Sequence, residues 1–484
     1  AHLFERVWEL GDGNPLFTEE LAAAGGRAER LGSPRLRDLI GARITNLPPD
    51  AQDVLRVAAV LGRGIDLRLL TAACPHDRTA IDEAMQRGLD EQVLVRASDR
   101  NASYRFRHEL VRSVMAEQLG AFEARAAHSA CADALEARAD VDPSEIAYHR
   151  DAAGDDEAAL RWHARAGLDT DARHAYVAAL RHYERVLELL EASIEGEAVI
   201  GASRQRILQR ASTAAARAGM HDRAIELARR SLAITGDDEL AELVRSRLRW
   251  YLWEAGRSDE ALDEARRAVS RTYPTGSERW QANATAHLAG LLLVHDEIED
   301  AREHAETALR LAQAAGATEE EVLANGIIGG CLLLEGDVDA GIGRIDQALE
   351  AARRIEEEDA RLPADRLDDR RFPVGVVLAS TQLAGAYEVA DRPDDAIRIA
   401  EAGYLRAAEQ GVARTYGATL RATTARAMYR AGSWSQALAT IEAALREGAS
   451  GSGRVSLLAI SALIHAARGA ALEADEAIRL AEED

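Results

Sequence analysis

The chain has 484 residues, its 59 basic side chains are all arginine, and its formal net charge is −23. A conventional nucleotide-binding P-loop needs the lysine of its G-x-x-x-x-G-K-[ST] motif, so the lack of lysine excludes one within this sequence. The acidity also disfavours direct nucleic-acid contact, which draws most of its affinity from neutralising phosphate charge.

Alanine, leucine, glutamate and arginine dominate the composition, and aromatic residues make up only 4%. Such residues favour helices, and the length predicts two or three folding units. No apolar run reaches the roughly 18 residues of a membrane span, so no membrane contact is expected. The widely spaced Cys74, Cys131 and Cys331 predict neither a zinc site nor a disulfide framework and fit a reducing cytoplasm. The chain begins within a helical pattern without a signal peptide, so we interpret it as a fragment of a larger cytoplasmic protein.

Residues 1–45 predict two or three short helices around a turn at residues 11–15. Pro15 suits the first position of a helix over residues 16–24, where its missing N–H is not needed. A second stretch with apolar residues at helical spacing follows at residues 36–44.

Residues 46–118 predict three helices followed by a β-hairpin. The first helix opens at Pro48 and Pro49, and the next two cover residues 67–73 and 79–90. Apolar runs at residues 93–95 and 104–106 then flank a polar turn, and we expect no other β-structure in the chain. Three helices and a hairpin are typical of a winged-helix domain.

The third of these helices would be the recognition helix of a DNA-binding winged helix. Against Arg78 and Arg87 it carries five acidic residues: Asp77, Asp82, Glu83, Asp90 and Glu91. Such a face repels phosphate, so we predict an intramolecular hinge and no DNA contact.

From about residue 150 onward a turn residue, glycine or aspartate, is followed five positions later by a small residue within an amphipathic helix. The pairs are Gly154/Ala159, Gly219/Ala224, Gly256/Ala261, Asp296/Ala301, Gly336/Gly341, Asp391/Ala396, Gly432/Ala437 and Gly469/Ala474. The pattern predicts a solenoid of helical hairpins, because a small residue lets two helices approach closely. We expect a helical linker and first hairpin over residues 119–170, a repeat superhelix over 171–484, and an extended loop at 356–372.

These hairpins resemble tetratricopeptide repeats. In that family's second helix a second small residue follows the turn residue by 12 positions. The sequence has such a residue at Ala268, Ala308, Ala348 and Ala444. The repeat of about 40 residues exceeds the family's usual period of about 34, and its trailing proline is missing. The longer-helixed repeats of bacterial signalling ATPases are the better comparison.

Two stretches near the start resemble the STAND signal-transduction ATPases. Residues 13–21 read GNPLFTEEL, similar to the G-N-P-L-F-x-E-E-L element of that family's helical lid, in which the proline packs on adenine. Residues 104–112 read YRFRHELVR, similar to the F-R-H-E/D-L segment that closes its winged-helix domain. The resemblance implies that Pro15 contacts a nucleotide and that His108 senses its phosphates in an ADP-bound off state. The alternatives are a helix-start proline and a capping or core histidine.

The order of these stretches is similar to that of large LuxR-type regulators of the maltose-activator kind. The resemblance implies an ATPase domain before Ala1 and a DNA-binding helix-turn-helix after Asp484. ATP or ADP would then be a cofactor of the full-length protein only, and we predict that this chain is not an enzyme. The sequence indicates no catalytic constellation and no metal site; five histidines on predicted helices lack a carboxylate or cysteine at ligand spacing: His174, His182, His287, His295 and His304.

The predicted function is the regulatory portion of such a transcription regulator, with repeats that bind a small-molecule inducer or a protein or peptide and signal through the winged helix. One alternative is a protein-docking scaffold without a small ligand. Another is the same unit attached to a different output, such as a nucleotide cyclase. Self-association of the repeats is a further alternative.

The tetratricopeptide register predicts which side chains face the groove. Counting back from Gly256 gives Trp250 and Trp253, with Leu252 left for the core. The same count in later hairpins gives Gly290 and Leu293, Gly330 and Leu333, Gly385 and Glu388, and Arg426 and Tyr429. Aromatic faces beside small residues and a few polar groups suit an organic ligand or a peptide. The alternative is that the two tryptophans fill space between hairpins.

Overall fold

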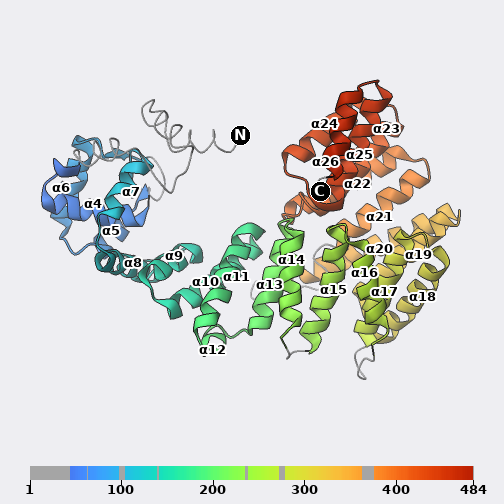
Figure 1. The fold of residues 1–484 in the computed structure, drawn as a ribbon, viewed down its shortest axis with the longest axis horizontal. Coiled ribbons are helices and arrows are strands. Elements are labelled where there is room, and N and C mark those ends of the chain that lie inside the picture. The colour runs from blue at the N-terminus through green and yellow to red at the C-terminus, as the bar shows by residue number, and fades with distance from the viewer. Residues whose placement is uncertain are drawn as a thin grey trace. The chain divides into compact units, whose positions relative to one another are not determined.

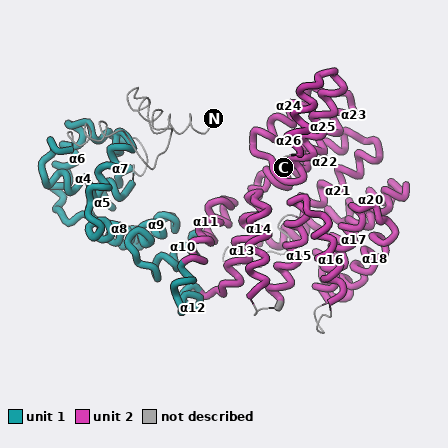
Figure 2. Tube along the Cα trace, in the orientation of Figure 1, with its two compact units in different colours: residues 1–166, 189–200 teal, residues 167–188, 201–484 magenta. Residues whose placement is uncertain are grey.

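The computed structural model describes residues 44–62, 64–97, 104–138, 141–234, 238–271, 278–361 and 375–482. The chain forms two compact units, unit 1 with residues 1–166 and 189–200 and unit 2 with residues 167–188 and 201–484 (Figure 2). Helices dominate both (Figure 1). Within the described ranges, no helix is long and apolar enough to cross a membrane.

The described part of unit 1 opens with helices around a small sheet. From residue 44 onward its elements are α4 (Pro49–Leu61), β1 (Gly64–Ile65), α5 (Leu67–Ala73), α6 (Arg78–Asp90), β2 (Leu94–Arg96), β3 (Tyr104–Phe106) and α7 (Glu109–Glu117). The side chain of Asp66 accepts a hydrogen bond from the N–H of Arg68 and caps α5, and Asp77 caps α6 through the N–H of Ala80. Asp77 therefore belongs to the helix start, where a carboxylate satisfies an unpaired N–H.

The sheet of unit 1 has three antiparallel strands in the order β1-β3-β2. The predicted hairpin is present, but the expectation of no further β-structure was wrong, because β1 pairs with the other edge of β3. Two residues are too few to show the alternation by which strands are found in a sequence. Phe106 and Ile65 are fully buried under α4 to α6.

The rest of unit 1 is helical. The elements are α8 (Ala121–Glu136), α9 (Pro143–Ala153), α12 (Gly196–Ile200) and parts of α10 (Asp156–Ala172) and α11 (Tyr176–Ala192), which both cross the unit boundary. Arg150 of α9 is buried and binds Asp133 and Glu136 of α8 at 2.6 and 2.9 Å, which joins the two helices. Gly154 ends α9 in a left-handed conformation.

The described part of unit 2 contains seven consecutive helical hairpins. They are α13 (Arg204–Arg217) with α14 (His221–Leu232), α15 (Asp238–Glu254) with α16 (Ser258–Val269), α17 (Glu278–Val294) with α18 (Ile298–Ala315), α19 (Thr318–Leu334) with α20 (Val338–Asp359), α21 (Gly375–Val389) with α22 (Pro393–Glu409), α23 (Tyr416–Arg430) with α24 (Trp434–Arg446), and α25 (Gly451–Ala467) with α26 (Ala471–Glu482). The predicted helical-repeat architecture is confirmed.

The predicted turn and small residues account for these hairpins. Each turn residue from Gly219 to Gly469 has a positive φ, including Asp296 at 60° and Asp391 at 55°. Glycine adopts this conformation without strain, and aspartate tolerates it better than most residues. The small residues after the turns lie between the paired helices, where most are 0% exposed: Ala224, Ala261, Ala301, Ala396 and Ala437.

The charged segment at residues 356–372 differs from the prediction. Its first residues belong to α20, where Glu356 binds Arg406 at 3.0 Å. The prediction of a loop was therefore wrong for residues 356–359, which continue the helix and are tied to the next hairpin by this ion pair. Residues 362–374 lie outside the described ranges.

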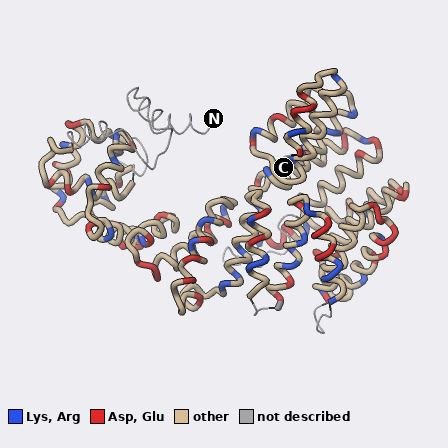
Figure 3. Tube along the Cα trace, in the orientation of Figure 1, with Lys and Arg blue, Asp and Glu red and all other residues tan. Residues whose placement is uncertain are grey.

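Acidic and basic side chains are interspersed along the helices of both units (Figure 3). Many form pairs one helical turn apart, such as Arg257 with Glu260 at 2.6 Å. Exposed pairs of this kind contribute about 0–1 kcal/mol each.

The last hairpins of unit 2 contact the first ones. The hydroxyl of Tyr176 donates a hydrogen bond to the carbonyl of Gln410 at 2.6 Å, and the indole Nε1 of Trp250 donates to the hydroxyl of Tyr416 at 2.8 Å. The repeats thus complete a superhelical turn and close on themselves. We call the contact of α23 and α25 with the last turns of α13 and α15 the seam.

Candidate functional site: a cavity inside the closed repeats

The inner face of unit 2 surrounds a partly open cavity of about 670 Å³. Its lining comes from the first helices of all seven hairpins, α13, α15, α17, α19, α21, α23 and α25. The volume lies within the range of about 300–1,000 Å³ typical of small-molecule sites. The lining is mainly apolar, with a few buried polar groups.

The cavity crosses the inner face diagonally. In α13 and α15 the lining includes the last turn, with Arg217 and Glu254, whereas in α23 and α25 it starts at the first turn, with Tyr416 and Ser452. Each hairpin of a solenoid is rotated slightly from the one before it. Over seven hairpins this rotation moves the cavity from one end of the first helices to the other.

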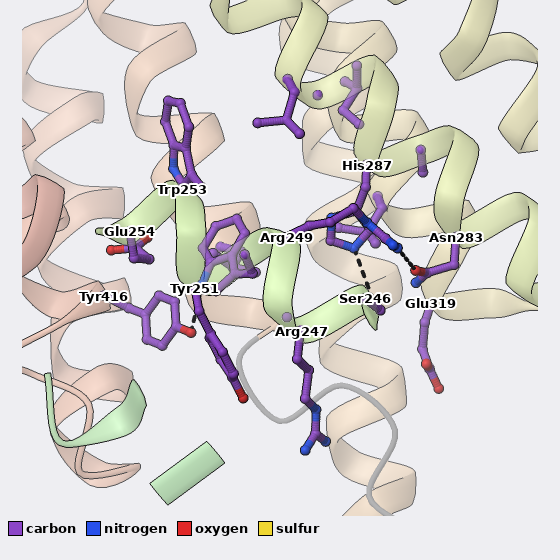
Figure 4. Close-up of a pocket in the computed structure, with 18 of the residues that line it drawn as sticks. Ser246, Arg247, Arg249, Tyr251, Trp253, Glu254, Asn283, His287, Glu319 and Tyr416 are labelled. Carbon is purple, nitrogen blue, oxygen red and sulfur yellow. Dashed lines mark hydrogen bonds between the residues drawn. The ribbon is translucent and has the colours of Figure 1, made fainter. Parts of the chain in front are cut away.

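One end of the cavity is aromatic. Trp250 and Trp253 are half-buried in the lining, and the ring of Trp250 stacks on Tyr416 with centroids 5.9 Å apart. The hydrogen bond between these two side chains fixes the stack across the seam. Figure 4 shows Glu254 between Trp253 above and Tyr416 below.

Glu254 ends α15 and is only 9% exposed. Burial raises the pKa of its carboxyl to about 7, against an ordinary value of 4.5, since the charged form loses its solvation. The hydroxyl of Ser452 in α25 donates to its Oε2 at 3.4 Å. Burial also lowers the pKa of the neighbouring His221.

The other end of the cavity holds a buried polar network (Figure 4). Arg249 is 3% exposed and donates to Oδ1 of Asn283 at 3.0 Å, and the Asn283 amide donates to Glu320 at 3.4 Å. Arg279 forms ion pairs with Glu319 at 2.6 Å and with Glu320 at 3.3 Å. Paired charges and amides of this kind offset much of the cost of burying them.

Between the two ends lie smaller polar groups. Arg247 donates to the hydroxyl of Thr213 at 2.6 Å, and the hydroxyl of Ser246 lies 3.3 Å from Nε2 of His287. Burial lowers the pKa of His287 to about 3, so its imidazole is neutral at pH 7. The neutral Ser246 and His287 can orient a ligand by hydrogen bonds, whereas the Arg247 guanidinium adds a positive charge at this level.

The groove residues predicted from the repeat register separate into two sets. Trp250, Trp253, Gly290 and Leu293 line the cavity, and Leu252 is fully buried in the core, as expected. Gly330, Leu333, Arg426 and Tyr429 do not line it. The prediction took the same positions of every first helix to line the groove. Because successive hairpins are rotated, the cavity meets each first helix at a different point along its length.

The second set makes other contacts. Leu333 is buried against the hairpin partner helix near Gly341, and Gly330 faces Leu293. Arg426 pairs with the buried Glu388, and the ring of Tyr429 contacts Trp434 at 5.9 Å between centroids. These contacts hold neighbouring helices together. A ligand role for either set stays a prediction.

Several residues that line the cavity were not predicted from the sequence. Arg247, His287 and Ile327 lie on the predicted stripe about one turn closer to the helix start, and Leu378 lies about two turns closer. Extending the stripe at helical spacing would have found them. The sequence does not indicate which part of each first helix, along its length, borders the cavity.

The predicted nucleotide contacts lie in the N-terminal part. Pro15 is outside the described residues. His108 occupies the N-cap position of α7 and is half-buried. Beside it, Arg112 donates to the carbonyl of Ala59 at 2.8 Å and pairs with Glu109 at 2.6 Å, which joins α7 to α4. A search of the described ranges finds no cluster of three metal-ligating side chains.

Comparisons with known proteins leave the family open. No family model and no curated protein sequence matches the chain. Among solved structures, a signal-transduction ATPase with a tetratricopeptide repeat sensor from Pyrococcus horikoshii is 14% identical, with a TM-score of 0.36 over 99% of this chain and 68% of that one. The apo quorum sensor NprR from B. thuringiensis is 11% identical, with a TM-score of 0.41 over 78% of this chain and 96% of that one. Likenesses this distant leave the functional interpretation to the cavity itself.

Proposed function

We propose that unit 2 is a sensor module whose inner cavity binds a signal molecule, a small organic compound or the end of a peptide. The observation that supports this is the cavity of about 670 Å³, walled by seven first helices and closed by the seam. Apolar walls with a few convergent polar groups are typical of ligand sites. The seam joins the first hairpins of unit 2 to the last ones. A ligand in the cavity would therefore contact helices from both ends of the unit.

We further propose that residues 46–118 form a winged helix that relays this signal to an ATPase outside the chain, as part of a STAND-type, LuxR-like transcription regulator. The element order from α4 to β3 supports the winged helix. The motif resemblances at residues 13–21 and 104–112 support the family. ATP or ADP would bind the full-length protein.

The cavity offers a matched test of ligand binding. Gly290 and Gly385 occupy equivalent positions in α17 and α21, but only Gly290 lines the cavity. A Cβ at Gly290 would meet Ile327 at 3.5 Å, an ordinary contact, and one at Gly385 would meet open space. Both sites therefore accept a larger side chain with little strain.

Gly290→Leu should fill part of the cavity and abolish binding of any ligand found by thermal-shift screening, while Gly385→Leu should leave its affinity unchanged. Calorimetric titration of the hit against both variants provides the measurement. Equal affinity in both variants would place the ligand outside the cavity.

A protein-docking role is the second candidate. The last residues of three successive first helices, Val294, Leu334 and Val389, are each 53% exposed. Repeated apolar residues along one edge suit a protein partner. Leu334→Glu should then release the partner while leaving cavity ligands bound.

The nucleotide role is tested in the full-length protein. If His108 contacts nucleotide phosphates, His108→Ala should weaken ADP binding by about tenfold to a hundredfold, the worth of a hydrogen bond to a charged group. ADP affinity measured by calorimetry is the readout. An unchanged affinity would leave His108 with a structural role at the start of α7.

A further inference from the structure

We propose that the aromatic end of the cavity selects ligands that carry an organic ammonium group, with the carboxylate of Glu254 as its counter-ion. This inference rests on the proposed sensor function, since the cavity must first bind a ligand. The ammonium proposal adds the chemical class of the bound group and names the residue that binds it.

Glu254 is a buried carboxyl without a cationic partner. Among the residues that the structure describes, no arginine forms an ion pair with it, and its side chain accepts one long hydrogen bond, from Ser452. By contrast, Glu319 and Glu320 at the other end of the cavity both pair with Arg279. A buried carboxylate is stabilised only when a cation or several donors meet it. A ligand cation would complete this site.

The walls beside Glu254 suit the same group. Trp250, Trp253 and Tyr416 line this end of the cavity, and an aromatic ring carries negative potential on its faces. An ammonium held within about 6 Å of such a face gains about 0.5–2 kcal/mol, more when it is desolvated. A carboxylate among aromatic rings therefore favours an organic cation over a neutral molecule of equal shape.

The charged and titratable groups around Glu254 do not supply a counter-ion for its carboxylate. From α13, Arg217 pairs with Asp171 at 3.4 Å and lies over the ring of Tyr176 at 5.2 Å. From α14, the side chain of His221 lies next to that of Glu254, because both border Gly451. A Cβ added to Gly451 would lie 3.0 Å from Nε2 of His221 and 3.1 Å from Oε2 of Glu254. Burial lowers the pKa of His221, so it is a neutral neighbour at pH 7 and above.

The groups that α23 and α25 bring to the carboxyl of Glu254 are uncharged. From α23 the phenol of Tyr416 is neutral, because burial raises its pKa. From α25 only the hydroxyl of Ser452 reaches the carboxyl. Arg217 also lines this end of the cavity, and Arg247 and Arg249 lie further along it, so an anionic ligand is the competing outcome.

Three probes of one shape separate these outcomes. Phenylethylamine is a cation, 2-phenylethanol is neutral and phenylacetate is an anion, and each is titrated calorimetrically into the full chain at pH 8. We expect phenylethylamine to bind at least about tenfold tighter than 2-phenylethanol, and phenylacetate to bind weakest. Tightest binding of the neutral or anionic probe would overturn the ammonium proposal and leave the sensor function standing. Failure of all three to bind would overturn both.

Variants assign the selectivity to one residue. Glu254→Gln should weaken phenylethylamine binding by about tenfold to a hundredfold and leave 2-phenylethanol binding unchanged, because the amide keeps the shape and loses the charge. Glu260→Gln, an exposed surface change, is the matched control and should alter neither. Glu254→Asp, which retains the charge, should keep part of the preference and shows that the cavity remains intact. An undiminished cation preference in Glu254→Gln would refute the assignment.

Discussion

The last turn of α15 and the last turns of α17, α19 and α21 occupy the same position in successive hairpins, yet their surroundings are opposite. The charged Glu254 is 9% exposed, whereas the aliphatic Val294, Leu334 and Val389 are each 53% exposed. The seam explains the inversion, since α23 and α25 cover α15 through Tyr416 and Ser452. Repeat position places a residue on its helix, and closure of the superhelix decides whether it is buried.

The largest expected effect breaks the seam itself. Trp250→Ala should cost about 3 kcal/mol of unfolding free energy, because it removes a half-buried indole, its stack and its hydrogen bond to Tyr416. Trp253 lines the same cavity without that bond, so Trp253→Ala should cost about 1 kcal/mol. Urea unfolding of both variants gives the difference. Equal losses would mean that the stack does not hold the seam.

The second effect depends on pH. In the folded chain the pKa of Glu254 is about 7, against an ordinary value of 4.5 in the unfolded chain. Between these values the folded state binds the extra proton, so stability falls as pH rises through this window, by up to about 3 kcal/mol. Glu254→Gln lacks this group and should gain stability relative to the parent chain over the same range.

Urea unfolding at several pH values from 4.5 to 8 measures this gain. His221, whose pKa is lowered by burial, contributes a similar slope to both proteins and so cancels in the difference. Glu260→Gln on the surface should show no such gain. Parallel pH dependences of the parent chain and Glu254→Gln would contradict the burial of this carboxyl.

A matched pair of turn glycines gives a smaller effect. Gly219 and Gly256 have φ values of +79° and +72°, so alanine at either site carries a similar strain of about 1 kcal/mol. A Cβ at Gly219 would also contact Oγ of Ser450 and lie 3.2 Å from its Cβ, while at Gly256 it would meet open space. Gly219→Ala should therefore be less stable by about a further 1 kcal/mol.

Denaturant midpoints of the two glycine variants measure this difference. Adding Ser450→Ala to Gly219→Ala should recover most of it, since the two side chains contact each other. A loss at Gly256 as large as that at Gly219 would show that the seam is not the cause.

The smallest effect concerns the open edge. Leu334→Gln and Val389→Gln should each change the unfolding free energy by no more than about 0.5 kcal/mol, because both side chains already face solvent. Thermal melts at two protein concentrations provide the measurement. A loss above 1 kcal/mol that depends on concentration would reveal a second copy of the chain on this edge.

The sequence predicted the local structure well because local physics sets it. The turn residues all adopt positive φ and the small residues after them are buried, as glycine conformation and close helix approach require. Trp250 and Trp253, predicted to face the groove, line the cavity, and their role in binding stays a prediction. The two-residue strand β1 was missed, because it is too short to carry a periodic signal.

By itself, therefore, the sequence determined the hairpins, their turns and the small residues at which the paired helices approach each other. The tertiary structure alone decided the level at which each first helix meets the cavity, which left Gly330, Leu333, Arg426 and Tyr429 outside and brought in Arg247 and His287. It also decided that Glu254 is buried while Val294 is exposed. The physical reason is that a small rotation between neighbours is invisible within one repeat and, summed over seven, closes the superhelix on itself.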